Sequence, residues 1–304
     1  LPEISKASTI DLPNGDSLIL EPVQRKENRL CLENFDPCAV LLNNDLSSGV
    51  PEILQNLEQT VIPPIHAGWA TRRKSSFFTA YDSVAKEFSS LIGIDPWLIN
   101  PYFGSCGKIN FSEKKGEDCV AKNVDKILLQ IREKYKQYDV KEDPFVIVKA
   151  DAGTYGMGVM TVKSGEEVRR LNRKQRNKMS VVKEGQPVTK VLVQEGVYTF
   201  ESINTAVAEP VIYMIDRYVV GGFYRVHTGR GKDENLNAPG MHFVPLSFES
   251  SCLLPANKTS RDYATNRFYA YSVIARLALL TAALELEKSA NSFVDSAPRT
   301  SREK

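Results

Sequence analysis

The sequence of 304 residues lacks the marks of a membrane or secreted protein. No run approaches the roughly 18 consecutive apolar residues that indicate a spanning helix. The N-terminus shows no basic stretch followed by an apolar run and a small-residue cleavage site, as a secretory signal would. These absences predict a cytoplasmic protein without a membrane partner. The first residue is Leu1 in place of Met, which predicts a fragment or a processed product.

Cysteine and histidine are scarce. The five cysteines are widely spaced and C-x-x-C does not occur, so we expect reduced thiols and predict neither a disulfide framework nor a zinc site. The three histidines, His66, His227 and His242, lack the spacing of metal ligands. The Walker pattern G-x-x-x-x-G-K-[ST] and the nucleophile pattern G-x-S-x-G are absent as well.

Excess charge of one sign is missing too. The 39 Lys and Arg side chains nearly balance 37 Asp and Glu, which leaves a net charge of +2 and predicts no nucleic-acid partner. Residues 169–178 are the exception, because they carry six basic residues and no acidic one. This segment could bind nucleic acid or close over a phosphate tail. Without interleaved aromatic residues, it favours a solvated surface helix or a mobile lid.

The apolar pattern predicts a mixed fold with α/β and α+β parts. Residues 38–42 form a short apolar run that predicts a buried strand, and residues 51–59 are typical of a helix. Together with an extended piece at 61–64, they predict a small α/β lobe over residues 1–66. Further on, the pattern predicts helices at 74–92, 123–138 and 268–287, strands at 145–148 and 191–195, and an antiparallel meander over 211–226.

The main chemical signal is a lysine followed by glycines. A strand ends in Lys149, a loop then holds Gly153, Gly156 and Gly158, and a second apolar strand begins at Val159. Glycines let the backbone turn N–H donors toward an anion, and a lysine beside them supplies positive charge for phosphate oxygens. This order is that of the ATP-grasp fold, in which a hairpin covers the triphosphate. An ordinary glycine-rich hairpin is the alternative.

A second signal lies about 45 residues further along the chain. Strand 191–195 ends in Gln194 and Glu195, followed by Gly196 and Val197. In ATP-grasp proteins the segment at this place joins two lobes, and its backbone meets the adenine edge. Gln194, Glu195 and Val197 are therefore predicted to contact the nucleotide, although a buried edge of a sheet would give the same pattern.

The third signal is an arginine at the end of a strand, near a loop of Asn and Gly. Arg225 is suited to the charge that develops when phosphate moves to a carboxylate. Asn235 or Asn237 could ligate magnesium or orient an acyl phosphate, and Asn237 is our catalytic candidate. A structural arginine that satisfies loop carbonyls is the competing interpretation.

The order of these three signals resembles glutathione synthetase and its ATP-grasp relatives. In many such enzymes a lysine opens a helix upstream and reaches the nucleotide, and Lys74 is the best-placed match. The resemblance implies lobes over residues 1–66, 67–190 and 191–304. It also implies bound ATP and Mg²⁺.

Several stretches resemble one family closely, the glutamate–cysteine ligases of proteobacteria. They are residues 36–47, 68–75, 148–158, 193–200, 216–227 and 234–246, within a resemblance that covers most of 11–287. It implies that ATP phosphorylates the side-chain carboxylate of glutamate and that the amine of cysteine then attacks the acyl phosphate, the first step of glutathione synthesis. Family members extend further at the N-terminus, which implies that part of the substrate site lies outside this chain.

The resemblance leaves several points open. Asp45, Arg72 and Arg73 are candidates for the amino and carboxylate groups of the substrates, and loop capping is their alternative. Glutathione synthetases carry magnesium ligands after the Asn-Gly loop, whereas here only Glu249 occurs between 241 and 255, so Glu209 and Asn237 are guesses. A glutathione synthetase, another amino-acid ligase, or a nucleotide-binding protein without ligase activity are the rival functions. The sequence leaves open whether the chain forms homo-oligomers.

Overall fold

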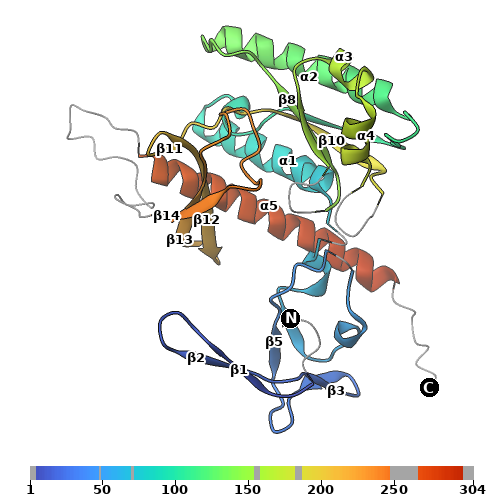
Figure 1. Cartoon of the computed structure of the whole chain (residues 1–304), viewed down its shortest axis with the longest axis vertical. Helices are drawn as coiled ribbons and strands as arrows, with labels where there is room; N and C mark the ends of the chain where they lie inside the picture. The colour runs from blue at the N-terminus through green and yellow to red at the C-terminus, as the bar shows by residue number, and fades with distance from the viewer. Residues whose placement is uncertain are drawn as a thin grey trace. The chain divides into compact units, whose positions relative to one another are not determined.

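The computed structural model describes residues 5–47, 49–69, 72–153, 158–181, 187–246 and 266–296, with side chains described as far as residue 288. The chain divides into two compact units, Leu1–Arg72 and Arg73–Lys304. Figure 1 shows a mixed α/β protein, as the sequence predicts; among the described residues the α-helices belong to the second unit, and the first unit has strands and short 3-10 turns. The sequence-based lobe boundaries at residues 66 and 190 remain predictions.

The first unit is built from three pairs of short strands. They are β1 (Ser8–Asp11) with β2 (Ser17–Leu20), β3 (Gln24–Lys26) with β4 (Arg29–Cys31), and the parallel pair β5 (Ala39–Leu41) with β6 (Thr60–Ile62). Leu30, Leu46 and Leu54 form its small core. The buried Gln59 side chain accepts from the Leu30 N–H at 2.6 Å and donates to the Leu30 carbonyl at 2.8 Å, which ties this core together.

Two predictions for this unit need correction. The predicted helix over 51–59 is only a 3-10 turn, η1 (Glu52–Leu54), because Asn56 adopts a left-handed φ of 52° that a helix cannot contain. A second such turn, η2, spans Ile65–Ala67. The predicted strand at 38–42 forms as β5, but its Leu41 is 83% exposed, since a two-stranded sheet covers little of its own surface.

The second unit contains a four-stranded sheet in the order β7-β10-β8-β9, with every neighbouring pair antiparallel. The strands are β7 (Phe103–Gly107), β10 (Lys190–Glu195), β8 (Val146–Ala150) and β9 (Val159–Val162). Helix α2 (Glu117–Gln137) contacts this sheet through one apolar stripe. The stripe consists of Val120, Val124, Ile127, Leu128 and Ile131, all buried with Val148 and Val193 in the largest core of the chain.

A second four-stranded sheet is an antiparallel meander. Its strands are β11 (Ser202–Ile203), β12 (Ala206–Ile215), β13 (Tyr218–His227) and β14 (His242–Pro245). The meander is confirmed, and β13 runs unbroken through Gly221 and Gly222. The register shifts between Tyr213 and Met214 of β12, where Val220 is the extra residue on β13.

Two long helices complete the second unit. Helix α1 (Lys74–Ile92) ends at Gly93, whose φ of 70° forms a left-handed cap. Helix α5 (Arg267–Ser296) packs on the second sheet through Phe268 and on α1 through Leu277. By length and composition alone, its part from Arg267 to Lys288 is apolar enough to cross a membrane, the single such helix among the described residues. A count of consecutive apolar residues does not detect this helix, because Ser272, Arg276 and Thr281 interrupt the apolar positions. Core helices of soluble proteins can have the same length and composition.

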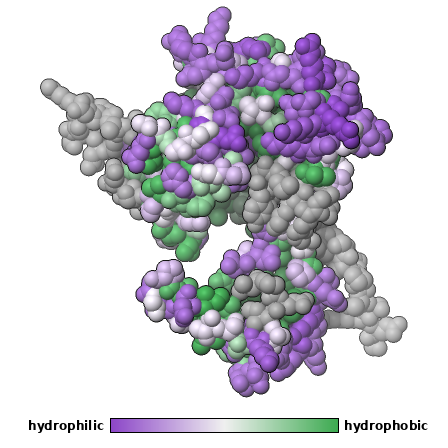
Figure 2. Space-filling view, in the orientation of Figure 1, coloured by the Kyte–Doolittle hydropathy of each residue, from purple (hydrophilic) through white to green (hydrophobic). Residues whose placement is uncertain are grey.

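The basic segment, residues 169–178, lies on the surface of the second unit. Helix α3 (Gly165–Arg169) precedes α4 (Arg173–Ser180), which begins with a capping box between Asn172 and Gln175. Met179 is the buried residue of α4, whereas its other side chains are exposed or half-buried. Figure 2 shows the hydrophilic side chains gathered on this side of the unit. The structure therefore gives a solvated surface helix, one of the two readings that the sequence favoured.

Candidate active site

Lys149 lies on the face of the first sheet that α2 does not cover. In β8 the residues Val146, Val148 and Ala150 are buried in the core, so alternation along the strand places Lys149 on the opposite face. Its ammonium donates to Gln194 Oε1 on β10 at 2.7 Å. Burial and the neighbouring charge of Lys74 lower the pKa of Lys149 to about 8, and the carboxylate of Glu209 opposes them. A cation with a lowered pKa is suited to bind an anion.

Lys74 opens α1 as predicted, and its ammonium contacts the beginning of the glycine loop. The Nζ atom donates to the carbonyl oxygens of Ala150 at 2.9 Å, Gly153 at 2.7 Å and Ala152 at 3.3 Å. Burial lowers the pKa of Lys74, because these carbonyls replace only part of its hydration. Since an ammonium has three N–H donors, Lys74 in this structure holds the loop itself.

Asp151 is a site residue that the sequence analysis missed. This carboxylate is 2% exposed and caps α1, because it accepts from the Ser75 N–H at 2.7 Å and from the Ser75 hydroxyl at 2.8 Å. Lys190 lies 3.3 Å from it. An ordinary cap precedes its helix by one residue, whereas Asp151 is 76 residues away, so no local pattern could have revealed it.

The glycine loop joins two paired strands, which confirms the predicted hairpin. Lys149 pairs with Val159 across β8 and β9, and the Ala150 N–H donates to the Gly158 carbonyl at 2.8 Å. Gly153 has a φ of 84° and Gly158 a φ of 61°, which are left-handed values that glycine adopts without a steric penalty. The predicted Gly156 lies outside the described residues.

The predicted hinge after β10 is held in place by Glu195. Its buried carboxylate accepts from Trp97 Nε1 and from the Tyr102 N–H, both at 2.9 Å, and burial raises its pKa. The Glu195 side chain is thus a structural anchor. Gly196 is required by close packing, because a Cβ there would lie 2.1 Å from the Phe145 ring. Val197 is 66% exposed.

The second sheet contributes Arg225 together with Glu209. They lie directly opposite each other on β13 and β12 and form an ion pair. The Nε atom of Arg225 is buried and has no hydrogen-bond partner among the described residues. An unsatisfied buried donor costs free energy unless a ligand or water meets it. An anionic ligand that accepts from the buried Nε would therefore satisfy Arg225.

His227 orders the loop that carries Asn237. Its Nδ1 accepts from the Gly229 N–H at 3.0 Å, and its Nε2 lies 3.0 Å from the Pro239 carbonyl. Within the loop, Asn235 Oδ1 accepts from the Asn237 N–H at 3.0 Å. Both ends of the loop are thus tied to one buried ring. Alternation along β13 places Arg225 and His227 on the same face of the strand.

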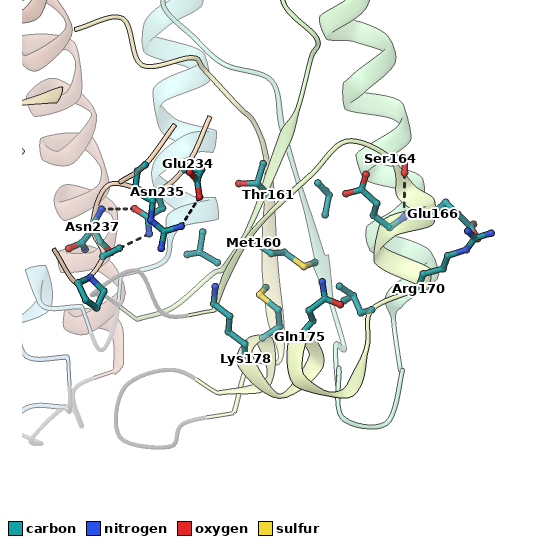
Figure 3. A pocket seen from close by; sticks show the side chains of 18 residues that line it. Met160, Thr161, Ser164, Glu166, Arg170, Gln175, Lys178, Glu234, Asn235 and Asn237 are labelled. Atoms are coloured by element: carbon teal, nitrogen blue, oxygen red, sulfur yellow. Dashed lines mark hydrogen bonds and ion pairs between the residues drawn. The ribbon is translucent and has the colours of Figure 1, made fainter. Parts of the chain in front are cut away.

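A cleft of about 800 Å³ opens beside this loop. Figure 3 shows Glu234, Asn235 and Asn237 on one side and Ser164, Glu166 and Arg170 on the other, with Gln175 and Lys178 of α4 below. Asn237 is the predicted site residue among its lining. The cleft adjoins the hairpin that contains the glycine loop, because β9 forms one of its walls.

The proposed substrate residues divide between the two units. In the first unit, Asp45 Oδ1 accepts from the Ser47 N–H at 3.0 Å, and its carbonyl accepts from the Trp69 N–H at 2.9 Å. The Arg72 guanidinium lies 5.3 Å from the centre of the Trp69 ring, so Asp45 and Arg72 both contact Trp69. Arg73 belongs to the second unit and immediately precedes α1.

The described residues contain no group of three His, Cys, Asp or Glu side chains that could by themselves hold a metal ion. Of the two guesses for magnesium, Glu209 pairs with Arg225, and Asn237 lines the cleft. Glu249 lies outside the described residues.

Comparison with known proteins decides the family. The sequence model of the family described as glutamate-cysteine ligase matches residues 1–286. The chain belongs to the glutamate–cysteine ligase family. It is therefore a glutamate–cysteine ligase that acts on small molecules, which confirms the family and the function implied by the resemblance in the sequence.

Solved structures give two further comparisons. A protein of Methylobacillus flagellatus KT, assigned as a gamma-glutamylcysteine synthetase, is 65% identical with a TM-score of 0.85, over 95% of this chain and 68% of that one. D-alanyl-alanine synthetase A of Vibrio cholerae O1 is 12% identical with a TM-score of 0.36, over 89% of this chain and 70% of that one, which is too distant to support an argument. A search of curated proteins gives no match.

Proposed function

We propose that this ligase joins glutamate to cysteine by an ATP-grasp reaction, with Lys149 and Arg225 acting on the transferred phosphoryl group from two facing sheets. The observation that carries the proposal is the buried Nε of Arg225, which has no hydrogen-bond partner among the described residues and lies opposite Glu209, a carboxylate that also opposes the lowering of the Lys149 pKa. Glu209 is the ion-pair partner of Arg225. The two predicted catalytic cations are therefore linked through one carboxylate, although they are 76 residues apart in sequence.

The reaction proceeds in two balanced steps. A side-chain carboxylate oxygen of glutamate attacks the terminal phosphorus of ATP, which forms an acyl phosphate and releases ADP. The amine of cysteine then attacks the acyl carbon, loses a proton and displaces inorganic phosphate, which leaves γ-glutamylcysteine. The protein has to align the reactants and neutralise the charge on the moving phosphoryl group.

Each charged residue has a distinct role in this proposal. Lys149 neutralises phosphate oxygens. Its lowered pKa shows that the buried ammonium is only partly compensated by negative charge, which a phosphate would supply. Arg225 meets the acyl phosphate through the buried Nε that lacks a partner among the described residues. Gly153 and Gly158 let the loop backbone approach the phosphates, while Lys74 holds the loop and shifts to the nucleotide when it binds.

The adenine ring would be recognised by backbone groups of the hinge. The Glu195 N–H already donates to the Tyr102 carbonyl at 2.7 Å, and the Gly196 N–H donates to the Phe145 carbonyl at 2.9 Å. Neither is available to the base. The exposed Val197 supplies the next N–H along the chain, and Gln194 lies between the hinge and Lys149.

Glu209 and Asn237 fit a magnesium ion that is held mainly by phosphate oxygens. Magnesium commonly takes one or two protein carboxylates and completes its shell with substrate phosphates and water, so a cluster of three acids is unnecessary. When bound, the ion supplies further positive charge for the triphosphate. Asp45, Arg72 and Arg73 remain our candidates for the amino and carboxylate groups of the amino acids.

Release of ADP that depends on both amino acids tests this proposal. We expect the rate of Lys149→Ala and of Arg225→Ala to fall by about 100-fold or more, because each removes a charge directed at the phosphoryl group. Lys141→Ala is the matched control, since Lys141 pairs with Asp139 on the surface and should keep full activity. Product analysis with glutamate and cysteine, and separately with γ-glutamylcysteine and glycine, identifies the substrates.

Wild-type turnover in both alanine variants would overturn the site assignment. Turnover with γ-glutamylcysteine and glycine alone would indicate a glutathione synthetase. ATP binding without phosphate release in any mixture would indicate a nucleotide-binding protein without ligase activity.

A further inference from the structure

Two cysteines outside the candidate active site lie in direct contact. Cys106 belongs to β7, and Cys119 lies in the first turn of α2. Their sulfur atoms are 2.7 Å apart, and both thiols are free. The side-chain amide of Asn123, one turn further along α2, donates to Cys106 Sγ at 3.0 Å. No local sequence pattern indicates this pair, because 13 residues separate its members.

The two thiols differ in their access to solvent. Cys106 is 2% exposed within the core beneath the first sheet, whereas Cys119 is exposed. Burial raises the pKa of Cys106 to about 12, so an external reagent meets Cys119 first. Contact with Cys119 nevertheless gives Cys106 the high effective concentration of an intramolecular partner. An exposed attacking thiol beside a buried resolving thiol is the usual arrangement of a reversible dithiol site.

We propose that Cys106 and Cys119 are a modification site, which closes to a disulfide by exchange with a low-molecular-weight disulfide. The Cys119 thiolate attacks one sulfur of R–S–S–R and displaces R–S⁻, which leaves a mixed disulfide on the protein. Cys106 then attacks the Cys119 sulfur and displaces the second R–S⁻. The two protons of the cysteines end on the displaced thiolates, so one protein dithiol and one R–S–S–R give one protein disulfide and two R–SH.

Cystine is a reagent of the required class. It is the disulfide of cysteine, which is a substrate of the family to which the chain belongs. The inference itself stands on the contact of the two sulfurs and does not depend on the proposed active site. Its failure and the failure of the proposed function are therefore separate outcomes.

The new bond would tie the edge strand of the first sheet to the helix that covers it. β7 lies at the edge of the sheet, and Cys106 pairs with Val191 of β10. Closing a loop of this length restricts the unfolded chain more than the folded one. We expect the thermal midpoint of the oxidised protein to rise by about 5–10 °C.

Mass spectrometry of the full chain tests the inference. The reduced protein is incubated with cystine, alkylated to block the remaining thiols and digested with trypsin without reduction. Trypsin cleaves after Lys108 and Lys115, so Cys106 and Cys119 fall in different peptides. We expect a linked pair made of residues 87–108 and 116–122, which dithiothreitol separates, and the rise in thermal midpoint that accompanies it.

Two variants make the result decisive. Cys119→Ser removes the exposed thiol, so Cys106 should stay unmodified and the thermal midpoint should not respond to cystine. Cys106→Ala should retain the mixed disulfide on Cys119. Exposed Cys38 serves as an internal control for reagent access. A linked pair that is absent from the wild type while Cys38 is modified would overturn the proposal, as would an equal thermal rise in the wild type and Cys119→Ser.

Discussion

The two sheets of the second unit differ sharply in how far they are buried. In β10, at the middle of the first sheet, four of six residues are buried, whereas in β12 of the second sheet one of ten is. The first sheet lies on α2 in the largest core of the chain, and the second shares a small core with Phe268 of α5. Burial is the main source of local stability, so the sheet that holds Lys149 is the rigid one.

The far end of the second sheet shows the contrast most clearly. Tyr213, Ile215, Tyr218 and Val220 are more than half exposed on the hairpin between β12 and β13. Figure 2 shows apolar surface over this sheet. Arg225 and Glu209 lie at the other end of the same two strands. We infer that Lys149 and the strand that carries it form a fixed platform, toward which the arginine adjusts when substrates bind.

Hydrogen exchange should reveal the largest difference between the sheets. The amides of Leu192 and Val193 in β10 should exchange at least about 1,000-fold more slowly than those of Met214 and Val219 in the exposed hairpin, because the former open only with the core. Exchange followed by mass spectrometry or NMR measures this ratio. Equal protection in both segments would refute the idea of a rigid and an adjustable sheet.

The same substitution, Val to Ala, made once in each sheet should give the next largest difference, in the free energy of unfolding. Val193→Ala should lower the free energy of unfolding by about 2–3 kcal/mol, since its fully buried side chain leaves a cavity in the core. Val220→Ala, at a side chain that is 54% exposed, should cost under about 0.5 kcal/mol. Urea unfolding of both variants measures the two costs. A larger cost at Val220 would mean that the second sheet is the better packed.

The same contrast explains how much the sequence could reveal. The helix at Lys74 and the strand before the glycine loop follow from local apolar periodicity, which survives because the first sheet and its helices bury one face each. The predicted start of α2 at residue 123 was late, since the helix begins at Glu117 after Gly116, whose φ of 81° ends the preceding loop.

Contacts between distant segments could not be predicted. Asp151 caps α1 through Ser75, which lies 76 residues earlier in the sequence, and no pattern within either segment indicates this. The same holds for the effect of Glu209 on the pKa of Lys149, because these residues belong to different sheets. The sequence therefore named Lys74, Lys149 and Arg225 as candidates, but it indicated neither the contact of Asp151 with α1 nor the ion pair of Glu209 with Arg225.

Lys149 offers the finest test of the platform, through its dependence on pH. Its pKa of about 8 lies below the ordinary 10.5, so between these values the unfolded chain binds more protons than the folded one. Stability should therefore rise with pH across this window as Lys149 loses its charge. Lys149→Met, which never carries the charge, should lose this rise and be more stable than the wild type near pH 7, as chemical unfolding at several pH values would show.

Activity should respond to pH in the opposite direction. If the Lys149 ammonium binds the phosphates of ATP, kcat/KM for ATP should fall as pH rises through about 8, by up to about tenfold for each further pH unit. Bound phosphate favours the charged form, so the corresponding fall in kcat should appear at higher pH. Lys149→Arg, which stays charged, should be slower but lack the fall. An unchanged pH profile in this variant would assign the titration to another group and leave Lys149 as a partner of Gln194 alone.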